Sequence, residues 1–130
     1  MPRKKSNDLK LTDLKKQSKS LDKMETYTLA NEKDLHFCPV FKGTKIQSLL
    51  NEYQEKTLYT IEHELDMDEQ TNYQYILLLT IKYFTHLGKD IPDTFEGQIE
   101  ALQWLIDNDI FEEIVNDVLD KKEINKVFDS

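Results

Sequence analysis

Residues 69–88 read EQTNYQYILLLTIKYFTHLG, and this stretch decides the fold. Mostly apolar residues recur at the three- and four-residue spacing of an α-helix and would form one wide face of it: Tyr73, Ile76, Leu77, Thr80, Ile81, Phe84 and Leu87. Helix stop signals follow, because His86 lies in the last turn, Gly88 comes next and Pro92 lies just beyond. We therefore expect a helix from about Glu69 or Thr71 to Leu87.

The opposite side of this helix is also largely apolar, since it carries Tyr75, Leu78, Leu79 and Tyr83. A helix that is apolar on both sides is either central to a core or keeps a second face for a partner. Most aromatic residues of the chain are expected in the core, but Tyr and Trp are also typical anchors of interfaces. The predicted partner-binding residues are Tyr75, Leu79 and Tyr83, on an outward face, together with Trp104.

Two further helices are predicted after Pro92, each by a capping pattern. Asp93 with Glu96, and Asp109 with Glu112, have the spacing of a capping box. The first of these helices would bury Phe95, Ile99, Leu102 and Ile106, with Trp104 and Leu105 at the border of the stripe. The second would bury Phe111, Ile114, Val115, Val118 and Leu119, and Ile124, Val127 and Phe128 predict a frayed continuation of it.

An earlier helix is predicted from Thr44, because Gln47 three residues later completes a capping box. Its apolar face comprises Ile46, Leu49, Leu50 and Tyr53. A similar stripe at Leu58, Ile61 and Leu65 belongs either to the same helix or to a second one after a break near residues 55–57. The sequence leaves both alternatives open.

Residues 24–41 have a different period, which favours two short strands or one hairpin. Tyr27 and Leu29 alternate with polar or small residues, residues 31–34 have the composition of a turn, and Leu35 and Phe37 alternate again. Two strands alone are marginally stable, so we expect them to pack on the helices or to pair with another chain. Pro39 indicates that the second strand is short or lies at an edge.

The first 23 residues are rich in Lys and Ser and contain no aromatic residue. They are predicted to be a basic flexible tail, and the alternative is a transient helix that docks on a partner. The predicted fold is thus mainly α: a single small helical domain over residues 24–130, with a short N-terminal β-hairpin or extended segment, preceded by the tail at residues 1–23.

Charge is distributed unevenly along the chain. The formal net charge is −8, and residues 1–23 carry eight Lys and Arg against three Asp, so residues 24–130 carry −13. An acidic body repels phosphate backbones, so we expect protein partners and no nucleic acid. No run of about 20 apolar residues or secretory signal is visible, and Cys38 is the only cysteine. No membrane association is expected, and the predicted location is the cytoplasm.

The sequence carries no motif that indicates catalysis, a cofactor or a metal. His36 and Cys38 would face the same way on a strand, but a zinc site would need His63 and His86 to converge there. The glycines are isolated, so no phosphate-binding loop is predicted, and the acidic segment from Asp66 lacks the pattern of a calcium loop. We expect a binding protein that is not an enzyme and uses no cofactor.

Three segments together resemble a known family: FKGTKIQSLLNEYQ at residues 41–54, ILLLTIKYFTHLGKDIPDTFEGQIEALQWLID at residues 76–107, and DIFEEIVNDVLD at residues 109–120. The chain resembles, over roughly residues 37–128, the tail assembly chaperones of long-tailed bacteriophages of the siphophage type. The resemblance implies a non-structural protein of the bacterial host cytoplasm. It would bind the phage tape measure protein and help recruit subunits of the major tail protein, which forms the tail tube.

Two other function classes remain open from the sequence. One is a small acidic regulatory or inhibitor protein of a mobile element, such as an antitoxin, which binds a basic protein partner. The other is an enzyme subunit with a buried carboxylate site. Self-association is also left open, since neither periodicity nor charge excludes a homo-oligomer.

Overall fold

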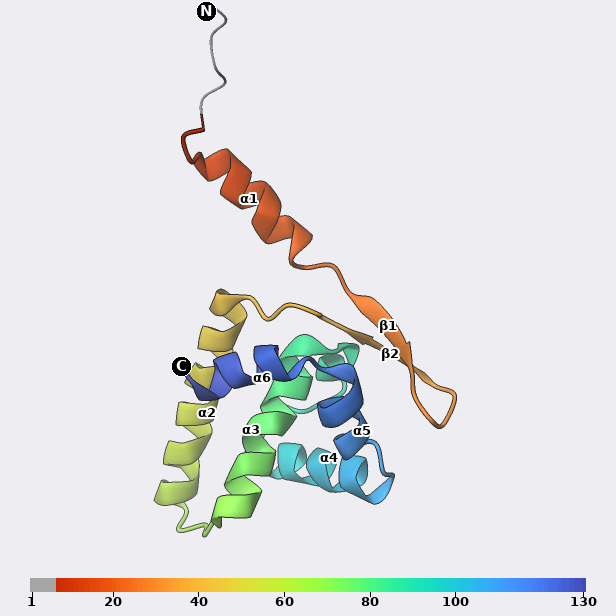
Figure 1. Ribbon diagram of the computed structural model, residues 1–130. Coiled ribbons are helices and arrows are strands. Elements are labelled where there is room, and N and C mark those ends of the chain that lie inside the picture. The colour runs from red at the N-terminus through yellow and green to blue at the C-terminus, as the bar shows by residue number, and fades with distance from the viewer. Residues whose placement is uncertain (1–6) are drawn as a thin grey trace, which may run out of the picture.

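The computed structural model describes residues 7–130 and is mostly helical, with one short hairpin near the N-terminus (Figure 1). In chain order the elements are α1 (Leu11–Ser20), β1 (Glu25–Thr28), β2 (Asp34–Phe37), α2 (Gly43–Glu62), α3 (Glu69–Phe84), the 3₁₀ turn η1 (His86–Lys89), α4 (Phe95–Asp107), α5 (Phe111–Glu113), the π-helical turn η2 (Ile114–Val118) and α6 (Lys121–Phe128). The predicted fold class, a small mainly α domain with an N-terminal hairpin, is confirmed. None of the helices within residues 7–130 is long and apolar enough to cross a membrane.

Helix α3 is the centre of the core. It packs against α2 on one side and α4 on another, and its residues Leu78, Leu79 and Ile81 are fully buried. Its N-terminus is capped by Asp68, whose carboxylate accepts a hydrogen bond from the backbone N–H of Thr71 at 2.7 Å. Every residue of α3 from Tyr75 to Phe84 is buried or partly buried, which explains why this part of the sequence is apolar on both sides.

Helix α3 ends at Phe84, three residues before the predicted end at Leu87. The cause is the hairpin: Thr85 has extended backbone and forms a β-bridge with Phe37, and the N–H of Cys38 donates to the carbonyl of Phe84 at 2.8 Å. Gly88 does not stop the helix, and its lack of a side chain is needed because its Cα lies close to the backbone of Lys82. A Cβ added at Gly88 would lie 2.0 Å from the backbone oxygen of Lys82.

The hairpin is antiparallel, with Glu25 opposite Phe37 and Thr28 opposite Asp34. Leu35 and Phe37 point into the core, as the alternation predicted, and the sheet therefore packs on the helices with one face. After the hairpin the ring of Phe41 stacks on that of Phe84, with centroids 3.9 Å apart. These contacts fix the hairpin against the C-terminal end of α3.

Helix α2 is continuous from Gly43 to Glu62, so the break considered near residues 55–57 is absent. The capping box predicted at Thr44 is wrong, because the helix begins one residue earlier and Lys42 at its N-cap gives no side-chain hydrogen bond. Residues Leu58 and Ile61, predicted to continue the apolar stripe, lie on the surface, 59% and 67% exposed.

The two capping boxes predicted after Pro92 are also wrong. Thr94 caps α4 by accepting from the N–H of Gly97, because the Asp93 carboxylate instead binds Lys82 at 2.8 Å. Asp109 has a φ of 59°, in the left-handed region, so it terminates the preceding turn and cannot cap the next helix. Helix α5 has no side-chain cap.

The C-terminal segment does not continue the preceding helix, contrary to the prediction. The backbone of Leu119 is extended, and the Asp120 carboxylate caps a separate helix α6 by accepting from the N–H of Lys122 at 2.7 Å. Ile124 and Val127 are buried, and α6 packs against α2. The C-terminal helix α6 thus covers part of the core.

Helix α1 lies outside this core. Figure 1 shows it leading away from the hairpin, and none of its residues is buried. Its C-terminal end is joined to the start of α2 by an ion pair of 2.9 Å between the Asp22 carboxylate and the Lys42 ammonium. The segment predicted as a flexible tail contains this ten-residue helix, and its first six residues lie outside the described part of the chain. Its flexibility stays a prediction.

Candidate functional site

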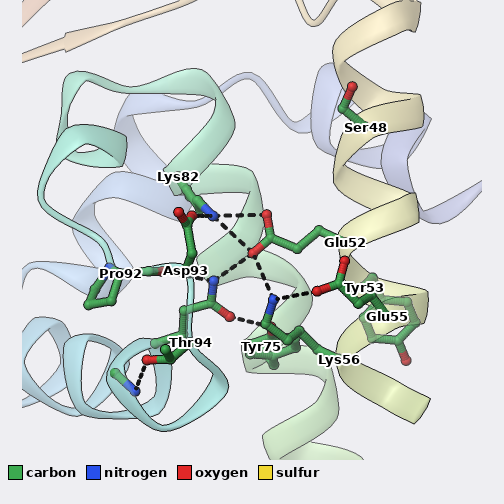
Figure 2. Close-up of polar contacts among 12 residues, drawn as sticks. Ser48, Glu52, Tyr53, Glu55, Lys56, Tyr75, Lys82, Pro92, Asp93 and Thr94 are labelled. Carbon is green, nitrogen blue, oxygen red and sulfur yellow. Dashed lines mark hydrogen bonds and ion pairs between the residues drawn. The ribbon is translucent and has the colours of Figure 1, made fainter. Parts of the chain in front are cut away.

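A cluster of polar side chains joins α2, α3 and the start of α4, and the carboxylate of Glu52 lies at its centre (Figure 2). The Lys82 ammonium donates to both Glu52 oxygens, at 2.8 and 2.9 Å, and the Tyr83 hydroxyl donates to Oε1 at 2.7 Å. The Gln98 amide donates to Oε2 at 2.5 Å. Lys82 also binds Asp93, which lies at the exposed edge of the cluster. We call these five residues the Glu52 network.

Gln98 links the Glu52 network to the core. Its side chain is completely buried, and its amide nitrogen also donates to the carbonyl of Pro92 at 2.9 Å. Its amide oxygen accepts from the hydroxyl of Tyr75 at 2.5 Å. Within the described residues, no buried side-chain nitrogen or oxygen lacks a hydrogen-bond partner. Buried amides are costly unless paired, so this pairing is what allows Gln98 to lie inside.

The ionisable groups of the network hold each other in their charged forms. Burial alone would raise the pKa of Glu52, but the hydrogen bonds from Lys82, Tyr83 and Gln98 outweigh it and lower that pKa below its ordinary value. Burial opposes the charge on Lys82 as well, yet Asp93 and Glu52 together raise its pKa. Burial and the neighbouring Glu52 carboxylate raise the pKa of Tyr83, so its hydroxyl stays a donor.

This arrangement favours a structural role for the Glu52 network. A general acid needs a carboxyl with a raised pKa, whereas the pKa of Glu52 is lowered and both its oxygens are already engaged by the protein. The sequence prediction missed the network. A sequence feature could have indicated it, namely a polar residue at a position where the helical spacing predicts a buried one. Gln98 is such a residue, because it lies three residues after Phe95 and four before Leu102, both on the apolar face of the predicted helix.

The four predicted partner-binding residues do not share a surface. Tyr75 and Leu79 are fully buried, so the prediction that they face outward is wrong; α3 is enclosed by its neighbours on that side as well. Tyr83 is partly buried, and its hydroxyl is used by Glu52. Trp104 alone of the four is well exposed, at 60% of its surface.

Trp104 stands at the rim of a small, mostly apolar groove between η1 and α4. The groove has a volume of about 280 Å³ and is lined by Leu87, Asp90, Ile91, Ala101, Trp104, Leu105, Asn108 and Ile110. Ile91 and Ala101 form its buried floor, while Asp90 and Asn108 supply polar groups. We call it the Trp104 groove. An exposed Trp beside buried aliphatic residues is typical of an interface anchor.

The soft metal ligands do not converge. His86 lies beside His36, with ring centroids 5.1 Å apart, and its Nδ1 accepts from the His36 backbone N–H at 3.0 Å. Cys38 is a buried free thiol, and His63 stacks on Tyr59 at the far end of α2. Across residues 7–130, no group of three His, Cys, Asp or Glu side chains could hold a metal ion.

Comparison with known proteins gives one family. Neither the curated proteins nor the solved structures contain a match to this chain. A family model described as YomO matches residues 11–130, from the first residue of α1 to the end of α6 and beyond. Because the match covers nearly the whole chain, the protein belongs to the YomO family.

Proposed function

We propose that this protein is a non-enzymatic tail assembly chaperone, which binds helical segments of a phage tape measure protein and helps recruit tail tube subunits in the cytoplasm of the bacterial host. The observation that carries the proposal is the Trp104 groove, an apolar recess with a mostly exposed indole at its rim. The choice of partner rests on the sequence resemblance over residues 37–128.

The chemistry of the groove suits an amphipathic helix. Its floor offers aliphatic contacts for one or two apolar side chains, and the exposed face of Trp104 can cover them from the side. Asp90 and Asn108 offer polar contacts to the backbone or to basic residues at the edge of such a helix. A recess of this size supports only weak binding at one site. Many copies along a long partner would gain strength through multivalency.

The alternative is an acidic regulatory or inhibitor protein that binds a basic partner. It is favoured by a separate observation, the charge of −13 over residues 24–130. The two functions predict a different dependence of partner affinity on salt concentration. Binding by charge weakens steeply with salt, because exposed charges are screened, whereas burial of Trp104 in a partner is far less sensitive to salt.

Coexpression with the tape measure protein encoded by the same phage tests the proposal. We expect the native protein to keep that partner soluble and to copurify with it in several copies. Trp104→Glu should abolish copurification while leaving the fold intact, because the indole is mostly exposed. Tyr73→Glu is the matched control, since Tyr73 is an aromatic residue of similar exposure on a different face.

Two results would separate the functions. If the tape measure protein stays insoluble with the native protein, the chaperone function is wrong. If a basic partner binds equally well to Trp104→Glu, and only at low salt, the regulatory function is favoured instead.

A further inference from the structure

Helix α1 has an apolar stripe, and none of the residues of this helix is buried. At 100° per residue, Leu11, Leu14, Ser18 and Leu21 fall within a narrow arc of the helix. Leu11 is 83% exposed and Leu14 is 38% exposed. The rest of α1 is basic, with Lys15, Lys16 and Lys19 against one Asp. Short helices of this kind are marginal in isolation, so α1 needs a partner surface for stability.

An open groove lies between the C-terminal half of α2 and the start of α4. It is a shallow groove of about 520 Å³ lined by Glu55, Lys56, Leu58, Tyr59, Glu62, Asp93, Thr94, Phe95 and Glu96. Leu58, Tyr59 and Phe95 form its apolar part, and Leu58 is 59% exposed. We call it the α2–α4 groove.

The groove and the helix are complementary in charge. The groove is lined by four carboxylates, from Glu55, Glu62, Asp93 and Glu96, and by one ammonium, from Lys56. Two of the carboxylates, those of Glu55 and Asp93, have mostly exposed side chains. A helix that carries two leucines on one face, with Lys15 and Lys19 to one side of them, would bury its apolar stripe and bring opposite charges together.

The helix of the same chain is too short to reach this groove. Asp22 is held at Lys42, the residue before α2, by the 2.9 Å ion pair. Leu58 stands sixteen residues along α2 from Lys42, about 24 Å at 1.5 Å per residue. Leu11 lies eleven residues from Asp22, about 17 Å if α1 folded back along α2. An α1 helix that docks in this groove would therefore belong to another molecule.

We infer that α1 of one copy docks in the α2–α4 groove of a second copy, and that the exchange is reciprocal. A reciprocal exchange closes a two-fold dimer, so it leaves no free groove to propagate a filament. The YomO family match begins at Leu11, so α1 is part of the family unit and the dimer uses a family element. This surface is separate from the Trp104 groove, and the inference does not depend on the proposed function.

Sedimentation equilibrium of the full chain tests the dimer. We expect the native protein to dimerise and Leu11→Asp/Leu14→Asp to be a folded monomer, because both leucines lie outside the core. Burial of one leucine corresponds to about tenfold in an equilibrium constant, and a two-fold dimer contains each leucine twice, so each single change should raise the dissociation constant by about a hundredfold. Tyr73→Asp, on another exposed surface, should leave the dimer unchanged.

Charge reversal tests the assigned surfaces directly. Glu55→Lys/Glu62→Lys should weaken the dimer, and adding Lys15→Glu/Lys19→Glu in the same chain should restore it. Loss of dimer without restoration would show that these charges do not meet. A native protein that is folded and monomeric throughout the concentration series would overturn the inference.

Disulfide trapping distinguishes exchange from docking within one chain. In a Cys38→Ala background, chains with Leu14→Cys are mixed with differently sized chains with Leu58→Cys and oxidised. We expect a mixed crosslinked dimer, and none when Tyr73→Cys replaces Leu58→Cys as the control. A chain that carries both substitutions and crosslinks only to itself would overturn the exchange.

Discussion

The interior and the surface of this protein differ in what they leave unpaired. Inside, no buried side-chain nitrogen or oxygen of residues 7–130 lacks a hydrogen-bond partner, and the Glu52 network pairs those between α2, α3 and α4. Outside, apolar side chains are exposed to solvent, at Trp104, at Leu58 in the α2–α4 groove and at Leu11 on α1. The interior is therefore saturated, and capacity for binding remains only on the surface.

The largest expected effect comes from breaking the apolar interior. Ile81→Asp should unfold the protein, because Ile81 is completely buried in the middle of α3. Loss of a buried aliphatic side chain costs about 2–5 kcal/mol and an unpaired buried carboxylate costs more, against a total stability of about 5–15 kcal/mol. A cooperative thermal melt like that of the native protein would show that α3 is not central to the core.

The next effect comes from opening the Glu52 network. Glu52→Leu leaves the Lys82 ammonium with only the exposed Asp93 carboxylate, and it removes one of the two acceptors of the Gln98 amide. We expect a loss of about 3 kcal/mol in the free energy of unfolding by urea, the lower end for a broken buried pair, since Lys82 keeps one partner.

The control for Glu52→Leu is Glu100→Leu on α4. Glu100 is exposed and lines neither groove, so its replacement should change the unfolding free energy by less than about 0.5 kcal/mol. Equal losses for the two variants would mean that the Glu52 network contributes no more than a surface ion pair.

Acid should weaken the interior through the same carboxylate. The pKa of Glu52 is lower in the folded protein than in the unfolded chain, because burial is outweighed by hydrogen bonds from Lys82, Tyr83 and Gln98. The unfolded chain then binds more protons, so stability from Glu52 is fully present above the unfolded pKa and is lost as pH falls through the folded pKa.

Urea unfolding over a pH series therefore gives a defined comparison. The native protein should lose stability below the ordinary pKa of a glutamate, and Glu52→Gln should lose less over the same range. Glu100→Gln should follow the native curve. If Glu52→Gln follows it too, the acid sensitivity arises elsewhere, for example at Asp68 or Asp93, whose pKa values are also lowered.

The difference between interior and surface also determined which features the sequence could predict. The position of α3 and the alternation of Leu35 and Phe37 follow from local periodicity, and both are found in the structure. The helix caps do not follow from periodicity, because an acidic side chain near a helix start can bind another partner instead of the backbone. Asp93 binds Lys82, which lies eleven residues away. A pairing of this kind depends on the fold and not on spacing.

The prediction that Tyr75 and Leu79 lie on the surface was wrong for a related reason. A helix that is apolar all round was given an outward face, yet its neighbours cover Tyr75 and Leu79 completely. Sequence periodicity shows that a side chain is apolar, but it does not show how many elements pack around it. Trp104 was placed at the border of an apolar stripe, and such border positions are where exposure and apolar character coincide.

The smallest expected effect concerns Trp104, and it distinguishes a binding residue from a core residue on one helix. Trp104→Ala should change the free energy of unfolding by no more than about 0.5 kcal/mol, because most of the indole is already in solvent. Leu102→Ala, two residues away on the buried face of α4, should cost about 2–5 kcal/mol. The two variants differ in burial and lie within the same helical turn, so helix propensity and local backbone contribute little to the contrast. If Trp104→Ala destabilises as much as Leu102→Ala, the indole is part of the core in solution, and the Trp104 groove has no free anchor to offer a partner. If its effect stays small, the indole is free in the monomer to contact a partner.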